Sequence, residues 1–162
     1  MVHVKWSGGL HAVQPARGKF ARPVVFPQPK AIVPMAYHVS KADFAGHVER
    51  VLAELPDKFA AALEEVPVQI EQRPSRRLLR SLGLADDELL LGLYQGASLI
   101  DRVEREGFGS PMPKHILVFQ EDVELASDSE ADLVHEIRTT VLHELGHYFG
   151  MDEEDLDELG YG

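Results

Sequence analysis

Residues 140–150 read Thr-Val-Leu-His-Glu-Leu-Gly-His-Tyr-Phe-Gly, with two histidines four positions apart and a glutamate directly after the first. On a helix with about 100° per residue, His143 and His147 lie within about 40° of each other, and Glu144 lies beside them. The apolar residues of the stretch fall on the opposite face. Such a helix packs its apolar face against a core, and its histidines face a cleft. This spacing is typical of a helix that binds zinc next to a general base.

A catalytic zinc ion takes a third protein ligand and keeps one position for water. The chain contains no cysteine, so the ligands must be histidines or carboxylates. Gly150 predicts the end of the helix, and a glycine there lets the chain turn back toward the metal. Only twelve residues follow, so we expect the third ligand among the acidic residues between Asp152 and Glu158. Acidic side chains at the start of a short helix also suit its dipole, without any metal.

Length and charge narrow the class of protein. A chain of 162 residues predicts one domain with a real core, and the formal net charge of −11 argues against a nucleic-acid partner. No apolar run is long enough for a membrane span, and no secretory signal is visible. With no cysteine either, the cytoplasm is the expected compartment.

The first 36 residues differ in composition from the remainder. They contain five of the ten prolines, and residues 1–40 carry a charge of +5, which leaves −16 for the remainder. We expect a disordered, basic extension at 1–36 and one domain at 37–162, because the extension cannot bury enough apolar area to offset its ordering entropy. A basic anchoring arm and a translation start at Met35 are the alternatives.

The apolar periodicity predicts an α+β domain with a small mixed or antiparallel sheet and helices on one side. The helix with the histidines lies near the C-terminus. The predicted elements are a helix after Ser40 to about Leu63 interrupted at Pro56, strands at 66–71, 89–94 and 115–120, a polar connection at 73–90, a loop at 107–113, a helical turn at 121–126, and helices at about 131–149 and 153–159.

Residues 40–162 resemble the small bacterial zincin-like metallopeptidases, the minimal zincin family. The resemblance rests on the segment Gly-Leu-Tyr-Gln-Gly at 92–96, the strand at 116–119, the motif from His143 to Gly150, and the closing Leu-Gly-Tyr at 159–161. It implies a cytoplasmic domain with one zinc ion that hydrolyses peptide bonds and can form homodimers.

The resemblance also implies roles for single residues. Glu153 stands where family members usually carry an aspartate as third ligand, with Asp152 as the alternative. Glu144 corresponds to the general base, and Tyr161 takes the place of the methionine turn that supports the metal in larger relatives. Extended substrate is expected to pair with an edge strand at His115–Gln120, with Ile116, Leu117 and Val118 at its centre.

Two other functions fit parts of the pattern. One is a zincin scaffold without catalysis that binds a partner, because so small a domain offers little wall for a substrate cleft. The other is a metal-dependent ribonuclease, against which Glu144 and the negative charge both count. We therefore expect a peptide or protein substrate, and neither nucleic acid nor a membrane as partner.

Overall fold

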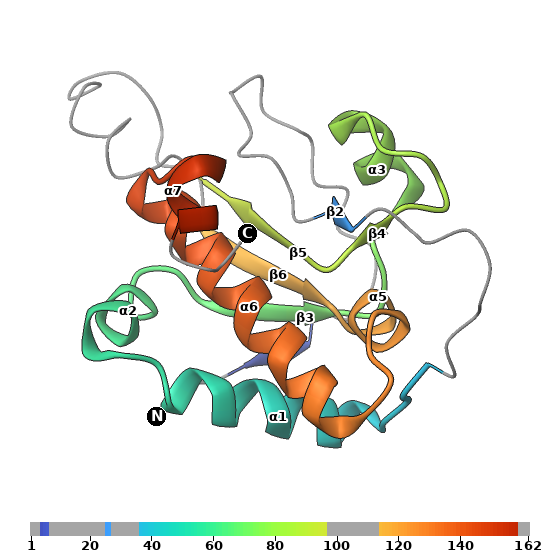
Figure 1. Ribbon diagram of the computed structural model, residues 1–162, viewed down its shortest axis with the longest axis horizontal. Helices are drawn as coiled ribbons and strands as arrows, with labels where there is room; N and C mark the ends of the chain where they lie inside the picture. Colours follow the sequence, from blue (N-terminus) through green and yellow to red (C-terminus); the bar gives the residue numbers. More distant parts are fainter. Residues whose placement is uncertain (1–3, 7–24, 27–35, 97–113, 159–162) are drawn as a thin grey trace.

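The computed structural model describes residues 4–6, 25–26, 36–96 and 114–158. Its centre is a four-stranded mixed sheet in the order β1-β3-β6-β5, in which β1, β3 and β6 are parallel and β5 is antiparallel to β6 (Figure 1). A separate ladder pairs β2 with β4. The strands are β1 Lys5–Trp6, β2 Val25–Phe26, β3 Val68–Glu71, β4 Leu89–Leu90, β5 Gly92–Gln95 and β6 His115–Phe119. The α+β class with a small mixed sheet is confirmed.

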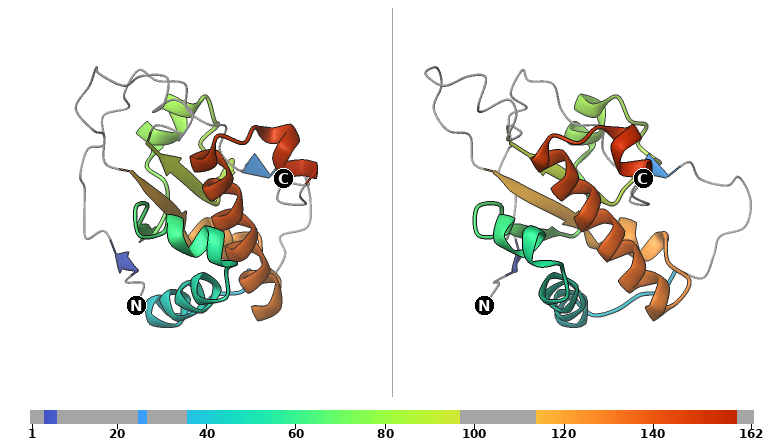
Figure 2. Two further views of the ribbon diagram at one scale, coloured as in Figure 1. Left: turned by 90° about the vertical axis from the view of Figure 1, so that its left-hand side faces the viewer. Right: turned by 60° about the vertical axis from the view of Figure 1, so that its left-hand side comes forward.

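Helices cover both faces of this sheet. One face packs against α1 and α6 through Ile70, Ile116 and Val118, and the other packs against α3 through Leu117 and Phe119 (Figure 2). The helices are α1 Lys41–Ala53, α2 Asp57–Ala62, α3 Arg76–Leu82, α5 Gln120–Leu125, α6 Glu130–Phe149 and α7 Glu153–Glu158. The prediction of helices on one side only was therefore wrong.

The region predicted as a polar connection contains α3. Ser75 caps its first turn by accepting the Leu78 N–H at 3.2 Å, and Gly83 ends it at a φ of 78°. The predicted strand at 89–94 is present but breaks at Leu91 into β4 and β5. The predicted loop at 107–113 lies outside the described residues.

Strand order corrects the expectation about the substrate edge. Ile116, Leu117 and Val118 of β6 each pair with β3 on one side and with β5 on the other. A strand with two neighbours has no open backbone groups for a substrate, so the predicted edge at His115–Gln120 was wrong. The edge next to α6 is β5.

The N-terminal residues also differ from the prediction of disorder. Lys5–Trp6 pairs in parallel with β3, and Val25–Phe26 pairs antiparallel with β4. The other residues up to 35 lie outside the described part of the chain. The disorder prediction was therefore wrong for at least these two short strands.

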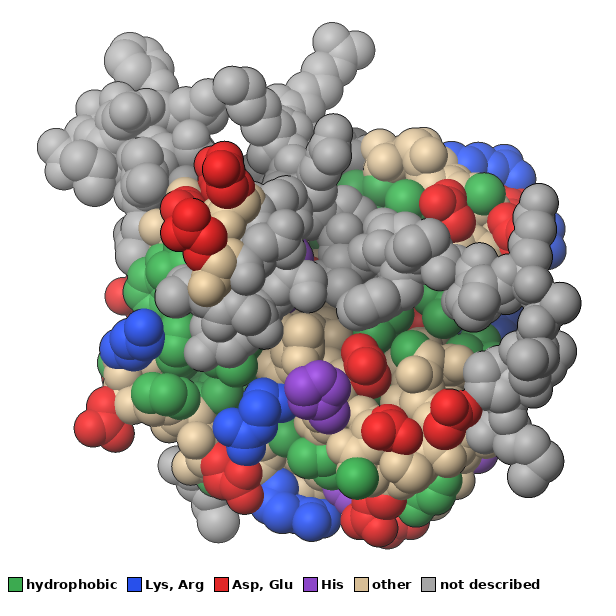
Figure 3. Space-filling view, in the orientation of Figure 1, with side chains coloured by type: hydrophobic (Ala, Val, Ile, Leu, Met, Phe, Trp, Pro, Cys, Tyr) green, Lys and Arg blue, Asp and Glu red, His purple; other side chains and the backbone are tan. Residues whose placement is uncertain are grey.

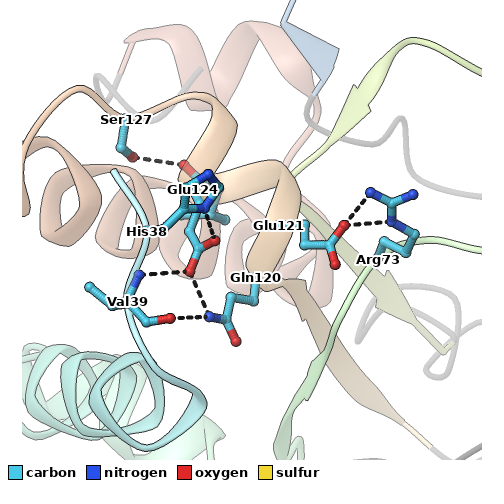
Figure 4. A network of polar contacts seen from close by, with 8 residues as sticks. His38, Val39, Arg73, Gln120, Glu121, Glu124 and Ser127 are labelled. Carbon is cyan, nitrogen blue, oxygen red and sulfur yellow. Dashed lines mark hydrogen bonds and ion pairs between the residues drawn. The ribbon is translucent and has the colours of Figure 1, made fainter. Parts of the chain in front are cut away.

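A buried carboxylate ties the entry of α1 to α5 (Figure 4). Glu124 accepts the Val39 N–H at 3.2 Å, the Gln120 amide N–H at 2.6 Å and the His38 Nδ1–H at 2.7 Å. Gln120 also donates to the Val39 carbonyl at 3.1 Å. These bonds fasten the segment before α1 to the helix that follows β6.

Among the described residues, no helix has the length and apolar character that crossing a membrane requires.

Candidate metal centre

The centre is built on α6, whose two ends are defined by local chemistry. Ser129 accepts the Asp132 N–H at 3.2 Å and so caps the first turn. At the other end Gly150 has a φ of 87°, and the Met151 N–H donates to the Gly146 carbonyl at 3.0 Å. This six-to-one bond is the Schellman arrangement that closes a helix at a left-handed glycine. The predicted helix and its stop at Gly150 are confirmed.

The structure brings the two motif histidines together. His143 and His147 are buried, and their Nε2 atoms lie 2.9 Å apart. Two nitrogens on a tetrahedral zinc ion, each about 2.05 Å from the metal, stand about 3.3 Å apart. The pair therefore fits a shared zinc ion after opening by a few tenths of an ångström.

The tautomer of His147 follows from its second nitrogen. Nδ1 lies 3.3 Å from the Met151 carbonyl oxygen, which can only accept a hydrogen bond. A hydrogen bond at this contact requires the proton on Nδ1, which leaves the Nε2 lone pair of the neutral ring facing His143. A hydrogen bond from the outer nitrogen to a carbonyl is the usual orienting contact of a metal-binding histidine.

Glu144 contacts β5, the edge strand of the sheet. It is fully buried, and its Oε2 accepts the backbone N–H of Tyr94 in β5 at 2.5 Å. A methyl group at Gly92 would overlap Thr140 Cγ2 and come within 3.2 Å of Glu144 Cγ. The glycine therefore lets β5 approach the turn of α6 that carries the glutamate.

The direction of β5 follows from the same contacts. Gly92 lies at Thr140, and further along the strand the Tyr94 ring lies 6.0 Å from the Tyr148 ring. Higher residue numbers in β5 therefore lie beside higher residue numbers in α6, so the strand runs parallel to the helix, as Figure 1 shows. The edge strand next to Glu144 thus lies along the helix that carries the histidines.

The predicted third ligand comes from the segment that turns back after Gly150. Glu153 is the first residue of α7, but its side chain and all of Tyr161 lie outside the described residues. Asp152 is exposed, and its carboxylate accepts the Asp155 N–H at 3.0 Å, which makes it a cap of α7. Among the side chains that the structure describes, no third histidine or carboxylate joins the two histidines.

The position of α7 was not foreseen from the sequence. Leu156 is fully buried, and a methyl group at Gly146 would overlap its side chain. Gly146, in the middle of the motif, therefore admits α7 against the helix turn between His143 and His147. The glycine within the motif was the available signal, because only a close approach requires it there.

Acidic side chains gather on the first half of α6, before the histidines. Glu136, two turns before His143 on the same face of α6, has its pKa raised, chiefly because burial disfavours its charged form. Figure 3 shows acidic side chains around the start of α6 and a basic group over α3.

Thr140 Oγ1 is buried with no hydrogen-bond partner among the described residues.

The family of the chain is shown by comparison with known proteins. Residues 63–162, more than half of the chain, match the family described as zincin-like metallopeptidases. The chain belongs to this family. No curated protein matches the chain. Membership of the zincin-like metallopeptidases indicates a metal-dependent peptidase, and the matched region contains β5, α6 and α7, which form the centre.

Proposed function

We propose that this zincin-like protein is a zinc-dependent peptidase in which His143, His147 and Glu153 hold one zinc ion and Glu144 is the general base. The observation that supports it best is the pair of Nε2 atoms 2.9 Å apart, with His147 Nδ1 against the Met151 carbonyl oxygen. Two neutral imidazoles from adjacent helical turns are the donor set that zinc prefers in a chain without cysteine.

When bound, zinc supplies a Lewis acid that polarises a carbonyl and acidifies water. Glu144 takes a proton from the attacking water at a carboxylate oxygen and passes it to the leaving amine. The Tyr94 N–H bond holds this carboxylate against β5, the edge strand of the sheet. Burial excludes bulk water from the carboxylate, which strengthens its interactions with the reacting groups.

An extended peptide is the substrate that this edge favours. The Phe119 N–H donates to the Leu91 carbonyl at 2.9 Å, so alternation along the strand turns the backbone groups of Gly92 and Tyr94 away from β6. The bond from Tyr94 to Glu144 agrees with this direction. Because the Tyr94 N–H is donated to Glu144, a peptide strand added along β5 would have to pair with other backbone groups of this strand.

Zinc content and peptide turnover test the proposal together. Elemental analysis should find one zinc ion per wild-type chain and per Glu144→Gln chain, but none in His143→Ala. The matched control is His135→Ala, an exposed histidine on the same helix, which should keep its zinc. Casein and mixed peptides should be cleaved by wild type and His135→Ala, and at least a hundredfold more slowly by Glu144→Gln.

Other outcomes separate the competing functions. Bound zinc without turnover that depends on Glu144 would contradict the peptidase and favour a scaffold that binds a partner. RNA cleavage that requires His143 and His147 would favour the ribonuclease.

A further inference from the structure

A cavity outside the metal centre lies at the carboxyl ends of two neighbouring parallel strands. β3 is followed by Gln72 and Arg73, and β6 is followed by Gln120 and Glu121. The Glu121 N–H donates to the Gln72 carbonyl at 2.9 Å, so the two turns lie side by side. All four residues line a cavity of about 380 Å³, and none of them belongs to the proposed metal centre.

The connections of these two strands explain why a crevice forms there. From β3 the chain continues to α3 on one face of the sheet, and from β6 it continues to α5 and α6 on the other face. Neighbouring parallel strands whose connections leave to opposite faces open a crevice at their carboxyl ends, where open sheets bind small ligands. The volume lies near the lower end of the range for small-molecule sites.

The Gln120 amide has a fixed orientation and brings an acceptor to this cavity. Its nitrogen donates to the Val39 carbonyl at 3.1 Å and to the Glu124 carboxylate at 2.6 Å, and both partners accept (Figure 4). The amide therefore cannot turn over, and its Oε1 is directed to the other side. Gln120 is 2% exposed, and its Oε1 has no hydrogen-bond partner among the described residues. A buried acceptor without a donor is costly, so a ligand that supplies an N–H group is favoured here.

The charged groups around the cavity leave one cation without a counterion. The Arg73 guanidinium pairs with Glu121, and the Glu124 carboxylate already accepts three N–H groups. The Lys41 ammonium lies over the Trp6 ring, 4.7 Å from its centroid, and pairs with no carboxylate in the described ranges of the chain. A ligand with an anionic group would provide the partner that this lysine lacks.

An apolar side chain completes the lining. Leu125 is 41% exposed, and it is the only exposed large hydrophobic residue in the part of the chain that the structure describes. We propose that the cavity binds a carboxylate with an N–H group on the neighbouring carbon and an apolar side chain. This is the chemistry shared by an apolar amino acid and the last residue of a peptide.

Each part of this ligand has one partner in the cavity. Lys41 pairs with the carboxylate, Gln120 Oε1 accepts the N–H, and Leu125 contacts the apolar side chain. Oε1 is shielded from solvent, so the ligand enters by displacing side chains at the mouth, of which those of His38 and Arg73 are each 67% exposed.

The test is calorimetric titration of the full-length protein in low-salt buffer with four related compounds. Leucine is the free amino acid, and N-acetylleucine carries the amide N–H of the last residue of a peptide. Isocaproate lacks the N–H group, and N-acetylleucinamide lacks the carboxylate. The tighter binder of the first two identifies the source of the ligand. It should bind about fivefold or more tightly than each of the last two, which is the effect of one hydrogen bond or one exposed ion pair.

Variants test the partners separately, with folding checked by circular dichroism. Lys41→Met removes the charge, keeps an unbranched side chain, and should weaken binding of the tighter ligand about fivefold. Lys58→Met is the matched control, because Lys58 also lies over an aromatic ring, 4.6 Å from the Phe59 centroid, but does not line the cavity. Its affinity should equal that of wild type. Leu125→Ala should reduce the preference for N-acetylleucine over N-acetylalanine by about threefold or more.

Other outcomes would overturn the proposal. One is no binding of leucine or N-acetylleucine at about 10 mM. Another is equal affinity for isocaproate, or equal weakening by Lys41→Met and Lys58→Met. His143→Ala, which removes a proposed metal ligand, should bind the tighter ligand as wild type does. Binding that is lost in His143→Ala but kept in Lys41→Met would place the ligand at the metal centre instead, and the proposed peptidase function would be unaffected.

Discussion

The contact between Gly92 and α6 can be tested by adding and removing single methyl groups. Gly92→Ala places a methyl group where it overlaps Thr140 Cγ2 and crowds Glu144 Cγ at 3.2 Å. Thr140→Ser removes the overlapping methyl group and keeps the hydroxyl. The two changes should each destabilise the domain and should partly compensate when combined.

The magnitudes follow from packing. Inserting the alanine methyl group into a filled core should cost about 1–3 kcal/mol, and deleting the buried threonine methyl group should cost about 1 kcal/mol. Without direct contact, the double variant would lose the sum, roughly 2–4 kcal/mol. With the contact as described, the alanine occupies the space of the lost methyl group, so the coupling should reach at least about 1 kcal/mol. Compensation stays incomplete, because the Leu117 carbonyl also lies 3.2 Å from the added group.

The assay is urea unfolding of all four proteins, followed by circular dichroism. Peptide turnover is measured on the same samples. Gly92→Ala should lower turnover because it pushes on Glu144. It should leave zinc content unchanged because the atoms nearest the added methyl group belong to Thr140, Glu144 and Leu117 rather than to the histidines. Additivity within about 0.5 kcal/mol would refute the direct contact between β5 and this turn of α6.

Two further predictions concern stability. Burial raises the pKa of Asp122 from 3.8 to about 6. The folded chain therefore binds more protons between these values, and stability falls by up to about 3 kcal/mol as pH rises through that window. Asp122→Asn, whose amide oxygen can still accept the Leu90 N–H, should match wild type only below the unfolded pKa, at about pH 3, and be more stable at pH 8. Equal stability at both pH values would contradict the raised pKa. Gly146→Ala should destabilise the folded protein by about 1–3 kcal/mol, because the added methyl group clashes with Leu156. Gly46→Ala in α1 should stabilise it by about 0.5–1 kcal/mol, because alanine favours a helix more than glycine does and nothing lies within 4 Å of the added group. Urea midpoints that shift in the same direction would contradict the Gly146 packing.

The residues on α6 were predictable because their geometry is local. His143, Glu144 and His147 share one helix, and helical periodicity alone sets their relative directions. The contact of Glu144 with Tyr94 joins residues fifty positions apart. No local pattern encodes such a pairing, so the partner of the general base required the structure.

The sheet illustrates the same limit. The strands at 66–71 and 115–120 were found, but their order was not. The run Ile116 to Phe119 is apolar without interruption, which is typical of a strand covered on both faces rather than of an exposed edge. That pattern was the available signal that β6 is central. Helix α3 was missed because its apolar side chains are few, and β1 and β2 because two residues carry no periodicity.

The acceptor that orients His147 is a main-chain atom, the Met151 carbonyl, placed by the left-handed turn at Gly150. Systematic mutagenesis would therefore give an uneven picture of this centre. Replacing the Met151 side chain leaves its carbonyl in place, so position 151 should tolerate most residues although it directly contacts a proposed ligand. Position 150, which touches neither the ring nor the metal through a side chain, should tolerate few, because other L-residues resist its backbone angle. The orientation of His147 therefore depends most on Gly150, a residue without a side chain.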